Sequence, residues 1–177
     1  MDNDSILHPK LIETVQIQVK IDWLGQHGIR HWARVYEIGM RLARQTGANP
    51  KIIQLFALFH DARRFNEHND PQHGHRGAEL AKRLRNTLFP ELNELELDLL
   101  HQACSLHTSA ATHHDKTVQT CFDADRLDLG RVGKVPDPQF LCTDAAKNRL
   151  MRDWAYRRSI EGQIPENVLG VYVGQEF

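Results

Sequence analysis

Apolar residues recur every three to four positions along almost the whole chain, and this spacing constrains the fold more than any other feature. It predicts a first long helix from residue 28 or 29 to about residue 45, and Gly47 is typical of a helix end. Asn49 and Pro50 are typical of a helix start. We therefore expect a second helix through Phe59, which is apolar on nearly every side and should be buried.

The helical spacing continues through the second half of the chain. Three further apolar stripes are Gly77-Leu80-Ala81-Leu84-Leu88, Leu92-Leu95-Leu99-Ala103 and Val118-Cys121-Phe122-Leu129. A last helix is expected from about Thr143 to Ile160, with loops at residues 66–72 and 132–138. The tail at 168–173 fits either a short strand or an extended strap. Five to seven helices without strand alternation predict an all-α, compact helical bundle.

The composition fits one ordinary domain spanning residues 1–177, with no linker that divides it. Lys and Arg number 22 and Asp and Glu number 23, so we expect neither DNA nor RNA as a partner. No apolar run is long enough to cross a bilayer, and the acidic N-terminus does not resemble a signal peptide. The three cysteines are widely spaced and predict no disulfide framework. We expect a cytoplasmic protein without a membrane partner. The sequence does not determine the oligomeric state, and a homo-oligomer is possible.

Several polar residues occupy positions in the apolar stripes where leucine would be expected. By helical phase, the inward positions include four histidines and two aspartates: His31, His60, Asp61, His73, His107 and Asp125. The same phase places His75 on the polar face beside Glu79, and Asp123 beside Gln119 and Arg126.

A divalent cation explains this inward set better than separate hydrogen bonds do. A lone inward histidine is more often a hydrogen-bonded core residue, but a buried carboxylate without a partner costs several kcal/mol. The adjacent pair His60-Asp61 together with Asp125 favours one shared cation. Imidazole and carboxylate ligands without thiolate suit Mn, Fe, Co, Ni, Zn or Mg, and the sequence does not determine which of these metals binds.

Three motifs resemble the HD-domain superfamily of metal-dependent phosphohydrolases. They are His31-Trp-Ala-Arg-Val35, Ala57-Leu-Phe-His-Asp61 and Asp123-Ala-Asp-Arg-Leu-Asp128, and the resemblance covers a core of about residues 27–133, followed by a C-terminal helix and tail at 140–177. It implies a helical fold in which His31, His60, Asp61 and Asp125 bind a divalent metal.

The resemblance also implies a second metal in part of the superfamily. His73, in His73-x-x-x-Gly-Ala-Glu-Leu, and His107 look like the additional ligands, with Asp61 as the bridge; His75, two residues from His73, is the alternative. Arg64 stands where many members have Lys and is expected, with Arg63, to hold a phosphate oxygen. The sequence thus leaves open whether each chain binds one metal ion or two.

The expected activity is hydrolysis of a phosphate ester in a nucleotide or related small metabolite, which makes a small phosphorylated molecule the expected partner. Asp61, Arg63 and Arg64 are the candidate catalytic residues. Arg64, His113 and His114 are the candidate substrate-binding residues, and the two histidines are candidates to protonate the leaving oxygen. The alternatives are a di-iron oxygenase with the same ligands and a non-catalytic regulatory module that binds metal and nucleotide.

Overall fold

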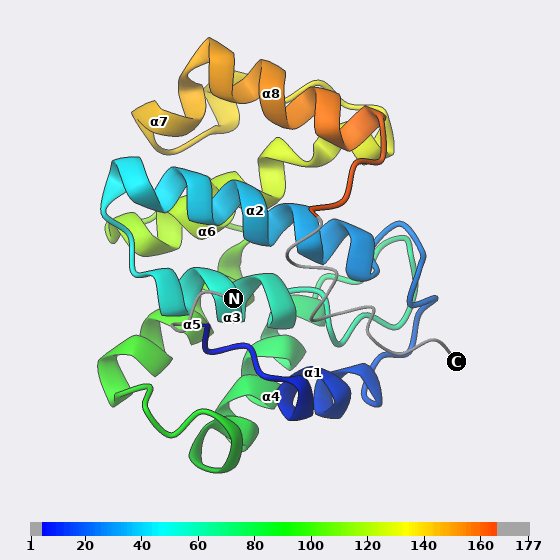
Figure 1. The fold of residues 1–177 in the computed structure, drawn as a ribbon, viewed down its shortest axis with the longest axis vertical. Helices are drawn as coiled ribbons and strands as arrows, with labels where there is room; N and C mark the ends of the chain where they lie inside the picture. Colours follow the sequence, from blue (N-terminus) through cyan, green and yellow to red (C-terminus); the bar gives the residue numbers. More distant parts are fainter. Residues whose placement is uncertain (1–4, 166–177) are drawn as a thin grey trace.

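The computed structural model describes residues 5–165, and this part of the chain is helical without strands. It contains eight α-helices and two short 3-10 helices (Figure 1): α1 Pro9–Gln16, α2 Ile29–Thr46, α3 Pro50–Phe59, α4 His73–Leu88, α5 Glu94–Leu106, α6 Lys116–Leu127, η1 Leu129–Val132, η2 Pro138–Phe140, α7 Asp144–Lys147 and α8 Arg149–Ile160. The predicted all-α fold is confirmed. The expected tail structure at 168–173 lies outside the described residues.

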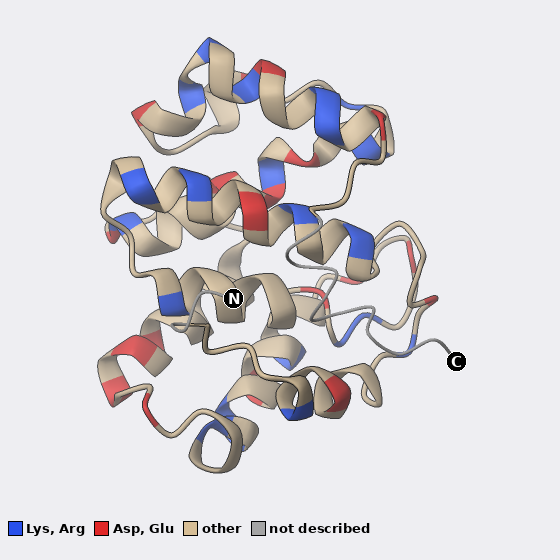
Figure 2. Cartoon of the chain, viewed as in Figure 1, with Lys and Arg blue, Asp and Glu red and all other residues tan. Residues whose placement is uncertain are grey.

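Helix α3 is the centre of the fold. It contacts α1, α2, α4, α5 and α6, and every residue from Ile52 to Phe59 is buried. In Figure 2 its ribbon is almost free of charged residues, whereas the surrounding helices carry both signs. The Asn49 side chain accepts a hydrogen bond from the Lys51 amide and Pro50 fills the first turn, as the sequence predicts. The two residues that follow α3, His60 and Asp61, are therefore buried in the middle of the molecule.

Two glycines let α4 approach its neighbours closely. A Cβ on Gly74 would lie 2.1 Å from the Cys104 carbonyl oxygen in α5, and a Cβ on Gly77 would lie 2.1 Å from that of Phe59. Because no side chain fits at either position, the α4 backbone rests directly on α5 and on the end of α3. This contact places the first residue of α4, His73, against the centre of the fold.

The structure differs from the sequence prediction in two helices. The last helix is divided into α7 and α8 because the Asn148 backbone is extended (ψ 130°), and its side chain caps α8 by accepting from the amides of Leu150 and Met151. Of the predicted stripe at α5, Leu92 and Ala103 are buried and Leu99 packs against the core, but Leu95 is 70% exposed, while Leu100 is buried. An Asn93–Glu96 capping box starts α5 at Glu94 and turns Leu95 toward solvent.

Within residues 5–165, none of the helices is long and apolar enough to cross a membrane.

Candidate metal centre

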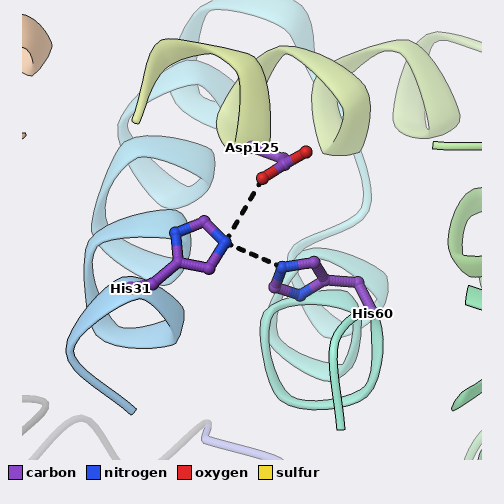
Figure 3. Close-up of side chains that lie close together, drawn as sticks. All are labelled: His31, His60 and Asp125. Carbon is purple, nitrogen blue, oxygen red and sulfur yellow. Dashed lines mark hydrogen bonds and ion pairs between the residues drawn. The ribbon is translucent and has the colours of Figure 1, made fainter. Parts of the chain in front are cut away.

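Three side chains from separate helices form a first cluster in the interior (Figure 3). His31 comes from α2, His60 directly follows α3, and Asp125 lies on α6. The Nε2 atoms of His31 and His60 are 3.0 Å apart, and His31 Nε2 is 3.3 Å from Asp125 Oδ1. Their ligand atoms lie within 4.8 Å of one another, close enough to share one metal ion.

A second cluster of the same kind lies beside the first. Asp61 follows His60, His73 begins α4 and His107 directly follows α5. His73 Nε2 is 3.0 Å from Asp61 Oδ1 and 3.1 Å from His107 Nε2. These three residues are buried, and their ligand atoms also lie within 4.8 Å of one another. The structure therefore brings His73, and not the exposed His75, to the interior.

The Asp61 carboxylate joins the two clusters. Its Oδ1 faces His73, while its Oδ2 is 3.7 Å from His31 Nε2 and 3.6 Å from His60 Nε2. One oxygen thus lies toward each cluster. A carboxylate in this position can bridge two cations, which is the arrangement that two-metal sites require.

Hydrogen bonds fix how the four imidazoles present their nitrogens. In each ring Nδ1 lies beside an acceptor oxygen: Asp128 Oδ2 for His31 (2.7 Å), the Phe56 and Ala57 carbonyls for His60 (3.1 and 3.2 Å), the Asp70 carbonyl for His73, and the Cys104 carbonyl for His107 (2.8 Å). Because carbonyl and carboxylate oxygens only accept, Nδ1 carries the proton. In the neutral ring, Nε2 then turns a lone pair inward.

This proton arrangement supplies a test of whether a metal fits. Two neutral imidazoles cannot hydrogen-bond through two Nε2 lone pairs, yet His31 and His60 meet at 3.0 Å and His73 and His107 at 3.1 Å. Each pair thus directs two ring nitrogens at one point, where a cation could bind both, and Arg64 Nη1 also lies 3.1 Å from His73 Nε2. Burial lowers the pKa of His60 to about 3 and also lowers the pKa of His107, which disfavours a proton on either of these two rings. The donor set therefore fits a divalent cation.

The Asp61 carboxylate is ionised as well as buried. Burial alone raises the pKa of Asp61, but interaction with His60, the hydrogen bond with His73 and the charges of other imidazoles outweigh it and hold the pKa well below its ordinary value. An ionised carboxylate is the form that can bind a cation. Oxygen and imidazole donors without thiolate suit the borderline and harder divalent metals.

Asp128 and Arg34 form a support for His31 that sequence reasoning missed. Arg34 Nε donates to Asp128 Oδ1 at 2.6 Å, and the opposite oxygen, Oδ2, binds His31. Asp128 is completely buried, and its pKa is lowered: the hydrogen bond from His31 and the charge of Arg34 outweigh the effect of burial. A signal was present, because Asp128 lies seven residues after the inward Cys121 and so shares its helix face.

The predicted polar position of Asp123 is wrong. Its side chain is buried and accepts hydrogen bonds from the Cys142 amide and from the amide and hydroxyl of Thr143. The segment before α7 packs over this carboxylate, and that long-range contact has no signature in the helical phase of α6.

Arg64, predicted to bind phosphate, lies at the second cluster, whereas its neighbour Arg63 does not. Arg64 Nη1 is 3.3 Å from Asp61 Oδ1, and the carbonyls of Asn66 and His68 accept from its Nε and Nη2. Arg63 donates instead to the Gln18 carbonyl. The two arginines point to different surroundings because they occupy successive positions of one turn.

His113 and His114, the other predicted substrate-binding residues, lie in the loop before α6 and belong to neither cluster. His113 Nε2 is 2.9 Å from Gln102 Oε1, and its Nδ1 accepts from the Asp115 amide at 3.1 Å. The two rings pack together, with centroids 4.2 Å apart. Both ring nitrogens of His113 thus have local partners.

His27 lies next to the first cluster instead. Its ring is perpendicular to that of His31, with centroids 6.4 Å apart, and its Nδ1 binds Glu67 Oε2. Burial lowers the pKa of His27 despite the opposing effects of Asp61 and Glu67. The ring is therefore neutral at pH 7, with Nδ1–H donating to Glu67 and the lone pair on Nε2.

Comparisons with known proteins found a matching family model and a similar solved structure. The family model described as HD domain matches residues 28–130, which contain both clusters. Among solved structures, the chain is similar to a crystal structure described as a predicted HD superfamily hydrolase from an uncultured Thermotogales bacterium. The two share 26% sequence identity with a TM-score of 0.64, over 86% of this chain and 87% of that chain. No curated protein matches.

Proposed function

Because this chain belongs to the HD-domain family, we propose that it is a metal-dependent hydrolase that cleaves a phosphate ester of a nucleotide or of a related small metabolite. The likeness to a structure described as a predicted hydrolase supports the hydrolytic reaction. The imidazoles and Asp61 are buried, and the chain has a net charge of only −1, which favours a small substrate over a nucleic acid.

The observation that carries the proposal is the position of Asp61 between two pairs of facing imidazole nitrogens. His31, His60 and Asp125 would hold one cation, and His73 and His107 a second, with Asp61 shared. Bound there, a divalent metal lowers the pKa of a water molecule and polarises a phosphoryl oxygen. The four buried rings are held by hydrogen bonds, which fix the donors before substrate binds.

His27 is the residue we assign to proton transfer. In the proposed reaction a water oxygen forms a bond to phosphorus, the ester P–O bond breaks, and His27 Nε2 accepts the water proton and returns it to the leaving oxygen. Glu67 keeps the other ring proton on Nδ1 and so holds Nε2 ready to accept. His113 is poorly suited to this role because both its nitrogens are engaged.

Arg64 is the residue we assign to phosphate orientation. Its guanidinium lies at Asp61 and is anchored through two backbone carbonyls, so Nη1 is presented to the cluster in a fixed position. An arginine held in this way binds a phosphoryl oxygen without further loss of side-chain freedom.

A panel of phosphomonoesters and phosphodiesters, supplied with Mn²⁺, Co²⁺ or Ni²⁺, tests the function. We expect turnover by the natural protein and its loss in Asp61→Asn. The matched control is Asp98→Asn, an exposed aspartate on α5, which should retain activity. Oxygen consumption with bound iron, or nucleotide binding without turnover under every metal, would replace the proposal with the oxygenase or the regulatory module respectively.

A further inference from the structure

A third group of metal-type side chains lies on the outer surface of α4 and α5. It consists of His75 and Glu79, one turn apart on α4, and His101 on α5. Their ligand atoms all lie within 4.8 Å of one another, the same limit that the two interior clusters satisfy. His101 Nε2 is 2.9 Å from Glu79 Oε1, and the rings of His75 and His101 meet edge to face, with centroids 5.7 Å apart.

We propose that His75, Glu79 and His101 bind a divalent transition metal, with zinc the best fit, at a site separate from the interior centre. Two imidazoles and one carboxylate supply three ligands of the kind that zinc accepts, and water completes a tetrahedron. The i, i+4 spacing of His75 and Glu79 projects both side chains from one helix face. The packing of α4 on α5 brings His101 to the same place.

An ordinary surface ion pair explains only part of this arrangement. The Glu79–His101 pair accounts for two of the three donors, and an exposed pair of this kind contributes little to stability. His75 is exposed and nevertheless has its ring against His101. A third donor converging on the pair is what a metal site needs and an ion pair does not.

The site has a consequence for the interior because of where its helices lead. His73 precedes His75 by two residues on α4, and His107 follows His101 by six residues at the end of α5. A zinc ion bound to both helices would hold them together outside, while Gly74 keeps their backbones in contact inside. Zinc at this surface thus stabilises the helix pair that carries two interior donors.

The test counts zinc in the full chain. Natural protein and the double variant His75→Ala/His101→Ala are dialysed against the same buffered free Zn²⁺, and bound metals are counted by mass spectrometry. We expect the natural protein to hold one more zinc per chain, and its melting temperature at ten times Kd to rise about 3–6 °C more than that of the variant. The control His68→Ala removes an exposed histidine outside all three clusters and should keep the additional zinc.

Two outcomes would overturn the proposal. Equal zinc in the natural protein and the double variant would mean that the surface trio does not bind it. If the double substitution no longer lowers the zinc count in an Asp61→Asn background, the zinc lost from the double variant was an interior ion, and these histidines act on the centre instead. A melting temperature measured in EDTA shows whether the double variant is folded, and the single variant Glu79→Gln, which keeps both rings, should weaken zinc binding at least tenfold.

Discussion

His31 and Asp128 meet at 2.7 Å through Nδ1 and Oδ2, and this hydrogen bond determines which nitrogen of His31 faces the first cluster. With the proton held on Nδ1, Nε2 presents its lone pair to His60. The same carboxylate pairs with the buried Arg34. We therefore assign Asp128 as a positioning residue, which orients His31, a proposed metal ligand.

Asp128→Asn should lower the affinity of the first cluster for metal by about 10- to 100-fold, because the amide no longer holds His31 in one tautomer and orientation. Isothermal titration with Mn²⁺ measures this affinity. Asp128→Ala should also destabilise the fold by about 3–5 kcal/mol, since it leaves Arg34 buried without its partner. An unchanged metal affinity in Asp128→Asn, against Asp98→Asn as control, would contradict this role.

The metal-free protein should lose stability as the pH falls below the ordinary histidine pKa of 6.5. The folded-state pKa of His60 is about 3, so between these values the unfolded chain binds a proton that the native state does not. Stability then falls with decreasing pH, by up to about 1.4 kcal/mol per pH unit for each such histidine. Burial lowers the pKa of His107 in the same direction.

Urea unfolding in EDTA at pH 7.5, 6.5, 5.5 and 4.5 measures this dependence. Saturating metal should add stability at pH 7.5 and progressively less at lower pH, because protons compete for the same nitrogens. A free energy of unfolding that stays constant from pH 7.5 to 4.5 without metal would mean that the interior imidazoles take up protons equally in the folded and unfolded states, so that burial does not lower their pKa.

Arg64→Met should weaken phosphate binding by about 10- to 100-fold, the usual value of a hydrogen bond to a charged group. Inhibition by inorganic phosphate measures this effect. Arg63→Met is the matched comparison, since its guanidinium donates to the Gln18 carbonyl and not to the cluster. Equal losses in the two variants would refute the assignment of Arg64, provided that both melt near the natural protein.

His27→Gln should reduce kcat by about 10²- to 10⁴-fold and leave KM almost unchanged, because the residue is assigned to proton transfer and not to binding. It should also remove the acidic limb of the pH–kcat profile, in which His27 becomes protonated. A merely structural role would lower stability without changing the form of that profile. The metal content of the variant, measured in parallel, should equal that of the natural protein.

Gly77→Ala should destabilise the fold by about 1–3 kcal/mol, because the new methyl group would meet the Phe59 carbonyl at 2.1 Å. As α4 moves away, His73 leaves the second cluster, and metal content should fall toward one ion per chain. Lys82→Ala, on the exposed side of the same helix, should stay within about 0.5 kcal/mol. A stable Gly77→Ala protein with full metal content would show that α4 does not depend on this contact.

The all-helical fold could be predicted from the sequence, and so could the set of His and Asp residues that point into the interior. Both predictions depend only on helical phase. The inward side of α2 and the apolar α3 follow directly from spacing, and so does the choice of His73 over His75 for the interior. Spacing failed where contacts between distant segments decide the outcome: Asp123 is buried by the segment at Cys142, and Asn148 ends one helix and caps the next.

The site divides in the same way. The residues that form the two clusters lie in the predicted stripes. The residues around the clusters, which hold neighbouring side chains in place, do not stand out in the sequence. Glu67 and Gln18 lie in irregular segments, so helical phase says nothing of their contacts with His27 and Arg63. Asp128 lies on a predicted face but required the observation that α2 packs against α6.

With both interior clusters loaded as proposed, the two oxygens of Asp61 would make them thermodynamically dependent on each other. A cation at one oxygen would withdraw negative charge from the other, so the first ion to bind would lower the affinity for the second. Linkage makes this effect reciprocal: whichever cluster fills first, the other is weakened by the same factor. The chain would then exist in a singly loaded form over a range of metal concentrations, and metal supply would determine which of two loaded states the cell contains.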